Sequence, residues 1–420
     1  MEIGNRLRFY RIQQNMTQEE LASGIISISY LSKIENNQTS ASVEVLEMLC
    51  KRLGIQLIEE SEYSLLKELH DWYFTIVSRN KEEADSRYEK YVNVVQSTND
   101  STAYIHFVLF ELRYFLLQRD LEKAELQLNK INTFKDIFDD QMNYFYSKFF
   151  GLYNYMKNKF TTAKDYYKLA ERILNKSINI EKWEEADLYY SIGLTYSQLG
   201  KMALSNSYTH LALAIYQSRY DLKRSAECHV LLGICYLRTE EYELSEENYL
   251  LANKVVESMN DSNLRGIIYH NLGYLYSIQK RPNEAVKKYE KSLSYKLESN
   301  IEGKLVSIHG IITEYYSIEE YGFCKIWLLE AKRLQEEYGF KEYNVHFEIY
   351  NFLINDPSEE FEKFMQDIAL PYFQTKENMQ YLIKYSEILG NYFEKKFKYK
   401  QANRYYNITI KALRKLNYIY

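Results

Sequence analysis

Apolar residues recur every three to four positions along most of the chain, the pattern of amphipathic helices. In the first 60 residues these helices are short. The pattern predicts one helix that begins near Ile3 and ends near Gln14, followed by a second that begins after Thr17. Thr17 and Glu20 have the spacing of a capping box, in which each side chain accepts a hydrogen bond from the other residue's backbone amide. We therefore expect a defined helix start at Thr17.

Two further short helices follow in the same stretch. Ser27 or Ser29 can cap the third helix, whose buried face carries Leu31 and Ile34 three residues apart. Ser42 can cap the fourth. The apolar residues expected to point inward from that fourth helix are Val43, Leu46, Leu49 and Leu53. Four short helices joined by tight turns predict a small separate domain at residues 1–60.

From about Ser64 onward the pattern repeats with a period near 40 residues. Each clear copy has a glycine, a tyrosine three residues later and a small residue twelve later. These sets are Gly193, Tyr196 and Ser205; Gly233, Tyr236 and Ser245; and Gly273, Tyr276 and Ala285. Extending the frame in both directions gives nine copies, with further glycines at Gly151 and Gly390. Since glycine lets a second helix approach closely, the frame predicts stacked helical hairpins through residues 61–420.

Composition excludes several classes of protein. Glycine and proline make up only about 4% of the 420 residues, against roughly 12% on average, which argues against β-sandwiches and propellers. No apolar run reaches the roughly 20 residues of a membrane helix, and the N-terminus has no apolar signal core. The four cysteines show no CxxC spacing, so we expect buried, reduced thiols. The predicted fold class is all-α.

The first 60 residues resemble the helix-turn-helix domain of the phage-repressor (XRE) type. Residues 17–22, 31–36 and 53–55 carry the resemblance. It implies that the third helix enters the major groove of double-stranded DNA and that Arg11 pairs with Glu35 inside the domain. The side chains expected to contact DNA are Gln18, Ser27, Ile28, Ser29, Tyr30, Lys33, Asn36 and Asn37.

These side chains have different expected roles. Lys33 can donate to guanine, and Ile28 can contact a thymine methyl group. Gln18, Asn36 and Asn37 are placed to contact phosphates. The whole chain has a net charge of −5, and residues 1–60 hold six basic against eight acidic side chains, so one copy should bind DNA weakly. We expect two copies to read half-sites about 34 Å apart. The alternative is a helix-turn-helix used only for protein contacts.

The glycine frame resembles the tetratricopeptide repeat, although its period exceeds the usual 34 residues and approaches that of HEAT repeats. The resemblance implies a right-handed superhelix whose concave groove is lined mainly by the first helix of each hairpin. The candidate peptide contacts in that groove are Tyr155, Tyr190, Arg238, His270, Asn271, Tyr274 and His309. Asn271 leads this set, since an amide can both donate to and accept from a peptide backbone. Arg238 could hold a carboxylate.

The whole chain resembles the cytoplasmic quorum-sensing receptors of the Rap, Rgg, NprR, PlcR and PrgX group, and in length and repeat number it is closer to NprR than to PlcR. The resemblance implies a transcriptional regulator controlled by a short re-imported signalling peptide, acting in the cytoplasm as a homodimer or higher oligomer. The alternative is a Rap-like regulator that binds a phosphorelay response regulator or promotes its dephosphorylation, either as its sole role or as a second activity of the same protein. We expect no catalytic residue, metal or cofactor.

Overall fold

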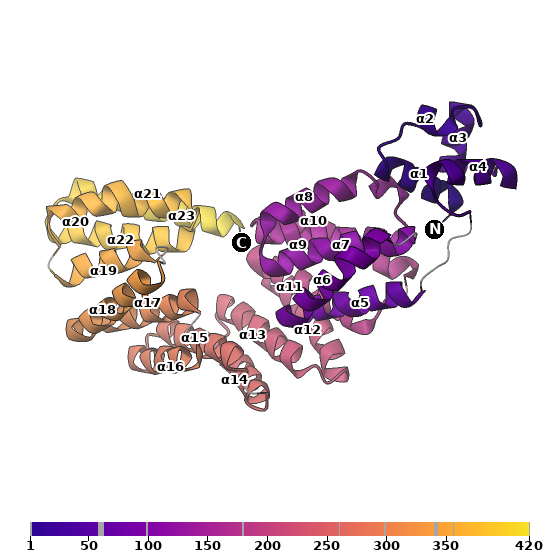
Figure 1. Cartoon of the computed structure of the whole chain (residues 1–420). Coiled ribbons are helices and arrows are strands. Elements are labelled where there is room, and N and C mark those ends of the chain that lie inside the picture. The colour runs from indigo at the N-terminus through magenta and orange to yellow at the C-terminus, as the bar shows by residue number, and fades with distance from the viewer. Residues whose placement is uncertain are drawn as a thin grey trace. The chain divides into compact units, whose positions relative to one another are not determined.

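The computed structural model describes residues 2–57, 63–97, 100–178, 180–259, 261–297, 300–339, 343–355 and 357–419. Over these ranges all regular structure is helical, which confirms the predicted fold class. The chain forms two compact units, Met1–Glu181 and Lys182–Tyr420 (Figure 1). The expected boundary between residues 60 and 61 lies outside the described residues. Among the described helices, none has the length and apolar character needed to span a membrane.

The first four helices form a small head at the start of the first unit. They are α1 (Ile3–Gln13), α2 (Gln18–Ala22), α3 (Ile28–Glu35) and α4 (Val43–Leu53). The capping box is present: the Thr17 amide donates to Glu20 Oε2 over 2.7 Å, and the Glu20 amide donates to Thr17 Oγ1 over 3.1 Å. Ser27 caps α3, and Ser42 caps α4.

The head core follows the expected apolar spacing except at one position. Leu31, Ile34, Leu49 and Leu53 are buried. The expectation that Val43 points inward is wrong, since its side chain is 58% exposed. The physical reason is that only the C-terminal half of α4 is buried, whereas Val43 is the first residue of that helix.

Three helical hairpins complete the first unit. Their helices are α5 (Tyr63–Val77) and α6 (Lys81–Ser97); α7 (Ser101–Gln118) and α8 (Leu121–Asn132); and α9 (Asp140–Met156) and α10 (Phe160–Ser177), with a 3-10 turn, η1 (Lys135–Ile137), before α9. Large rings fill the core. The Trp72 indole is fully buried and donates to the Ala84 carbonyl over 3.0 Å, which joins α5 to α6. Tyr73 stacks on Phe110 with ring centroids 4.6 Å apart.

The head is docked on these hairpins through α1. Phe9 is 2% exposed, and its ring lies 5.4 Å from that of Tyr104 on α7 and 5.8 Å from that of Phe134. Arg8 Nη2 forms an ion pair with Asp136 over 3.0 Å. Buried aromatic contacts of this kind stabilise one orientation of two packed elements, so the head and the second hairpin are held together.

Six further hairpins form the second unit. Their helices are α11 (Lys182–Gln198), α12 (Met202–Ser218), α13 (Leu222–Arg238), α14 (Tyr242–Glu257), α15 (Ser262–Ile278), α16 (Pro282–Tyr295), α17 (Ile301–Ser317), α18 (Tyr321–Tyr338), α19 (Asn344–Ile354), α20 (Glu359–Phe364), η2 (Met365–Ala369), α21 (Leu370–Thr375), α22 (Met379–Lys395) and α23 (Tyr399–Ile419). The η2 segment is a π-helix that joins α20 to α21, so these three pieces together form the second half of the eighth hairpin.

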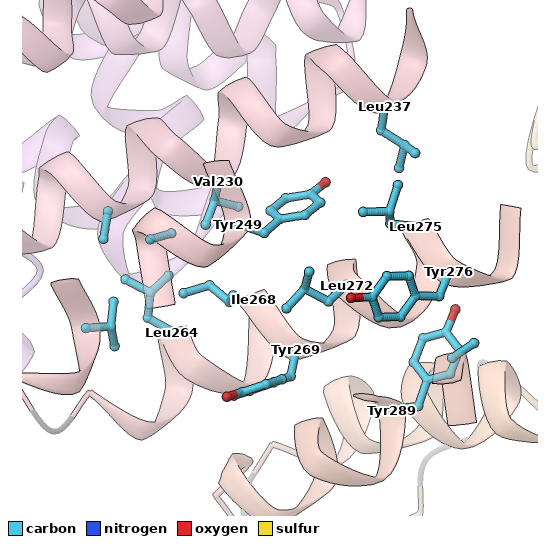
Figure 2. Packing of buried hydrophobic residues seen from close by; sticks show 14 of the residues in the cluster. Val230, Leu237, Tyr249, Leu264, Ile268, Tyr269, Leu272, Leu275, Tyr276 and Tyr289 are labelled. Atoms are coloured by element: carbon cyan, nitrogen blue, oxygen red, sulfur yellow. The ribbon is translucent and has the colours of Figure 1, made fainter. Parts of the chain in front are cut away.

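The repeated glycines have a common packing role. A Cβ atom at Gly233 would lie 2.5 Å from the Tyr249 ring, and one at Gly273 would lie 2.6 Å from the Tyr289 ring. Both tyrosines are sixteen residues after their glycine, on the second helix of the hairpin. Figure 2 shows Tyr249 and Tyr289 within the core that α13–α16 build. The Ser245 hydroxyl donates to the Gly233 carbonyl over 2.8 Å. The frame therefore marks where two helices approach most closely.

Candidate functional site

The outward face of α3 carries the first group of predicted contacts. Ser27, Ser29 and Lys33 are exposed, and Ile28 is 47% exposed. The Lys33 ammonium has no partner among the described residues, so its three donors are available to a ligand. The Ser27 and Ser29 hydroxyls lie 3.2 Å apart at the start of the helix. These four side chains form a polar face with one apolar member and one cation.

The other predicted DNA contacts have partners inside the head. The Gln18 amide donates to Glu35 Oε2 over 2.8 Å. The Asn36 amide donates to the Ser32 carbonyl over 2.8 Å, and the Asn37 amide donates to Asn5 Oδ1 over 2.9 Å. The Tyr30 hydroxyl reaches the Ser40 carbonyl at 3.4 Å. A DNA contact by any of these four would have to share or replace such a bond.

Glu35 is a buried carboxylate of the head that is paired with an arginine. Its carboxylate is 1% exposed and accepts two hydrogen bonds from Arg11, over 2.6 Å from Nε and 2.9 Å from Nη2. This confirms the predicted pair of Arg11 and Glu35. Arg11 Nη1 also donates to the Met16 carbonyl over 2.9 Å, which ties the end of α1 to the start of the helix-turn-helix. A buried carboxylate requires such partners, because an unpaired charge inside a protein is strongly unfavourable.

Three of the predicted peptide contacts, namely Tyr190, His270 and His309, take part in the packing of the second unit. Tyr190 is 9% exposed and its ring lies 4.9 Å from the buried Arg224 guanidinium. His270 Nδ1 lies 3.0 Å from Ser307 Oγ, a hydrogen bond between α15 and α17. Burial, together with nearby Lys296, lowers the pKa of His270 to about 3, so the ring is neutral near pH 7.

His309 belongs to a buried cluster rather than to an open face. It is 6% exposed, and its Nε2 lies 3.1 Å from the Tyr385 hydroxyl on α22. His346 on α19 approaches the same hydroxyl at 2.6 Å through Nδ1. Burial, with nearby Lys384, lowers the pKa of His346 to about 3. The same effects, together with the neighbouring His346, hold the pKa of His309 well below its ordinary value. The cluster joins three hairpins through neutral imidazoles.

Asn271, Tyr274 and Arg238 form the open part of the predicted set. Asn271 is half-buried, and its amide has no hydrogen-bond partner among the described residues. Tyr274, one helical turn further along α15, is 46% exposed. Arg238 at the end of α13 donates from Nη1 to the Ser197 carbonyl over 2.6 Å, which leaves its remaining donors to solvent or ligand. We call Asn271 and Tyr274 of α15, taken together with Arg238 of α13, the α15 face.

Sequence reasoning missed the polar groups that α22 brings to α17. Lys384 Nζ lies 3.3 Å from Thr313 Oγ1, and the Thr313 hydroxyl lies 2.9 Å from that of Tyr350. Tyr381, one helical turn before Tyr385 on α22, packs on the ring of His346 with centroids 4.3 Å apart. The forty-residue frame locates α22 as a first helix, but it holds no signal that α22 contacts a helix about seventy residues earlier.

Two observations show that the seven predicted peptide contacts do not form a single site around the cavity of the second unit. Tyr155 belongs to the first unit, where it is half-buried with its ring 5.4 Å from that of Phe160. A cavity of about 780 Å³ in the second unit lies between α18 and α19, with Leu329 and Phe347 in its wall. None of the seven predicted peptide contacts lines that cavity.

Comparisons with known proteins agree with this architecture. A helix-turn-helix family model matches residues 7–59, and a tetratricopeptide-repeat model matches residues 229–298. The transcriptional activator NprA of Geobacillus stearothermophilus is 43% identical over 404 residues, which cover 94% of this chain and 99% of NprA. The chain belongs to the NprA family.

Solved structures resemble this NprA-family chain in fold. The apo form of the quorum sensor NprR from B. thuringiensis superposes with a TM-score of 0.72 and 19% identity, covering 84% of this chain and all of that one. NprR in complex with its cognate peptide NprX superposes with a TM-score of 0.63 and 19% identity, covering 84% and 99%. At this level of identity, the likeness supports the predicted head and repeats, and leaves the individual contact residues as predictions.

Proposed function

We propose that this NprA-family chain is a transcriptional regulator whose binding to DNA is controlled by a short signalling peptide. The observation that carries the proposal is a complete helix-turn-helix, with an exposed polar recognition helix, on a chain that is 43% identical to a transcriptional activator over nearly its whole length. The chain acts by binding rather than by catalysis, and it works in the cytoplasm, where both DNA and a re-imported peptide are accessible.

The DNA contact is made by α3. Its exposed side chains present hydroxyl donors, one ammonium and one aliphatic group, which suit the mixed donors, acceptors and methyl groups of a major-groove edge. The side-chain amide of Gln18 at the start of α2 contacts phosphate, and so do Asn36 and Asn37 in the loop after α3. Residues 1–60 are slightly acidic, so nonspecific attraction is weak and two heads are needed on one operator.

The peptide contact is made by the α15 face. Asn271 supplies an unpaired amide that reads a peptide backbone without regard to sequence, and Arg238 supplies free guanidinium donors for a carboxylate. Tyr274 adds an exposed ring that packs on an apolar side chain. The fold relative NprR has been solved with a cognate peptide, which supports a peptide as the ligand class.

A head docked on its neighbouring hairpins gives the peptide a route to DNA binding. Because α1 is packed on α7 through Phe9, a change in the arrangement of the hairpins moves the head with them. The peptide must prefer one arrangement for this to regulate DNA binding. The peptide needs several contacts that differ between the two arrangements of the hairpins. A tenfold preference for one arrangement corresponds to only about 1.4 kcal/mol.

The test separates the two binding sites. The chain is used to select operator sequences from a random pool of double-stranded DNA. In a separate selection it is used to select peptides from a synthetic library of short sequences. Lys33→Ala combined with Ser29→Ala should abolish selection of specific DNA and leave peptide binding unchanged. Lys51→Ala, another exposed head cation on α4, is the matched control. If no DNA sequence is enriched by the unaltered chain, the proposal fails.

A Rap-like interaction with a response regulator is the second candidate. The repeat hairpins are compatible with it, but the helix-turn-helix head and the identity to NprA favour the first proposal. The two differ in one cellular result. Regulation that survives the Lys33→Ala and Ser29→Ala change untouched would favour the second candidate.

A further inference from the structure

Helix α12 differs from the second helices of the other hairpins. Over its 17 residues, Met202–Ser218, it contains no Asp, Glu, Lys or Arg, whereas every other hairpin has charged residues in its second helix. The second helix of a repeat hairpin normally carries a charged, solvated face. An uncharged face on such a helix therefore calls for an explanation other than solubility.

The outer face of α12 is apolar and exposed. Its buried side, which includes Ser205, Thr209 and Tyr216, packs on α11 and α13. On the opposite side Leu204 is 43% exposed and Leu211 is 49% exposed. The other exposed residues of this helix are Ala203, Ser207, His210, Ala214, Gln217 and Ser218, none of which is an acidic residue, a lysine or an arginine. We call this surface the α12 face.

The spacing on the α12 face suits a helix that packs lengthwise against another. Leu204, Ser207, Leu211 and Ala214 follow one another at intervals of three, four and three residues, the interval pattern of paired helices. If a second copy of α12 runs antiparallel about a two-fold axis near residue 209, Leu204 of one copy meets Ala214 of the other. Leu211 likewise meets Ser207. Each large side chain is opposite a small one, so the two faces can interdigitate.

The absence of charge favours a second copy over a different partner. A two-fold axis places identical surfaces against each other, so any charge near the axis meets its own sign. A helix without charged side chains is the one that avoids this repulsion. The exposed Leu244 and Leu251 on α14 follow Leu204 and Leu211 by 40 residues, and both helices pack on α13.

We propose that α12 is the centre of a symmetric interface between two copies of this chain, in which the helices pack antiparallel. The proposal deepens the proposed function, which requires two heads on one operator, by naming the surface that brings the copies together. It concerns self-association without DNA or peptide, so it is measured apart from both ligands.

The first experiment is analytical ultracentrifugation of the full chain at micromolar concentration. Leu204→Glu with Leu211→Glu should weaken self-association at least tenfold, because each copy would bring two carboxylates to the interface. The matched control is Ile326→Glu with Leu329→Glu on α18, where the side chains are 60% and 69% exposed. Circular dichroism verifies that both variants keep their helix content. A monomeric unaltered chain, an unaffected α12 variant, or dissociation by the α18 variant would each overturn the proposal.

The second experiment tests the antiparallel geometry. His210 lies closest to the proposed axis among the exposed residues, so His210→Cys should form a disulfide with its copy under mild oxidation. Ser218→Cys, at the end of the helix, would lie about 27 Å from its copy at 1.5 Å rise per residue and should not cross-link. The native cysteines are buried and free, so they do not compete. Equal cross-linking at both positions would contradict the arrangement, whatever the DNA and peptide assays show.

Discussion

The head and the glycine-framed hairpins of the second unit use their side chains in opposite ways. In the head, the residues that hold the fold, such as Arg11 and Glu35, are different from the residues that face outward on α3. In the hairpins, predicted contact residues such as Tyr190 and His309 are themselves part of the packing. A short capped domain can vary its exposed face freely, whereas a stacked repeat has to bury one side of nearly every helix.

This contrast affects how a binding residue is found. On α3, exposure selects Lys33 directly, since nothing else in the head needs it. On α15, only side chains that remain open after neighbouring helices have packed, such as Asn271 and Tyr274, can meet a ligand. The following four changes test whether structural and contact residues are as separate in the head, and as mixed in the hairpins, as the structure indicates.

The largest effect is expected at the buried carboxylate of the head. Glu35→Ala leaves Arg11 without its partner in a largely buried position, and breaking a buried pair typically costs about 3–5 kcal/mol. The head should unfold while the hairpins remain helical, which hydrogen exchange resolved along the chain measures. Glu19→Ala, at an exposed position of α2, is the control and should leave head protection unchanged.

The next effect is expected at a frame glycine. Gly233→Ala places a methyl group 2.5 Å from the Tyr249 ring, and overpacking of this kind costs about 1–3 kcal/mol. Gly322→Ala on α18 has open space around the new Cβ and should stabilise the chain slightly, since alanine favours the helix. Urea unfolding of both variants measures the difference. Equal stability of the two would show that the frame glycines are not needed for close helix approach.

A smaller effect is expected from acid. In the folded chain the pKa of His346 is about 3, whereas in the unfolded chain it is near 6.5. The unfolded state therefore binds more protons than the folded state between about pH 3 and pH 6.5. Stability therefore falls as the pH drops below 6.5, by about 1 kcal/mol for this group between pH 7 and about pH 5.5. His346→Gln should reduce the slope of stability against pH.

The smallest effect is expected for peptide affinity. Asn271→Ala removes one amide from the α15 face, and a hydrogen bond of this kind contributes about 1 kcal/mol, or roughly fivefold in affinity. Calorimetry with a peptide selected by the unaltered chain measures it. Asn263→Ala, exposed in the first turn of the same helix, is the control. An affinity within twofold of the unaltered chain would remove Asn271 from the site.

Much of the architecture is predictable because its signals are local. The capping box at Thr17, the serine caps of α3 and α4, and the glycine frame all act between residues close in sequence. The pairing of Arg11 with Glu35 came from resemblance to a family and is confirmed. The position of Val43 was mistaken because helical periodicity does not reveal how far along a helix its packing extends.

By itself the sequence determined four short head helices, nine hairpins and the close helix contacts at the frame glycines, since caps and periodicity act within a few turns. Only the tertiary structure decided that Phe9 is buried on α7, that Arg8 reaches Asp136, and that Lys384 reaches Thr313. Arg8 and Asp136 are 128 positions apart in the sequence, and Thr313 and Lys384 are 71 positions apart. No local pattern encodes such pairs, because packing of whole helices brings them together.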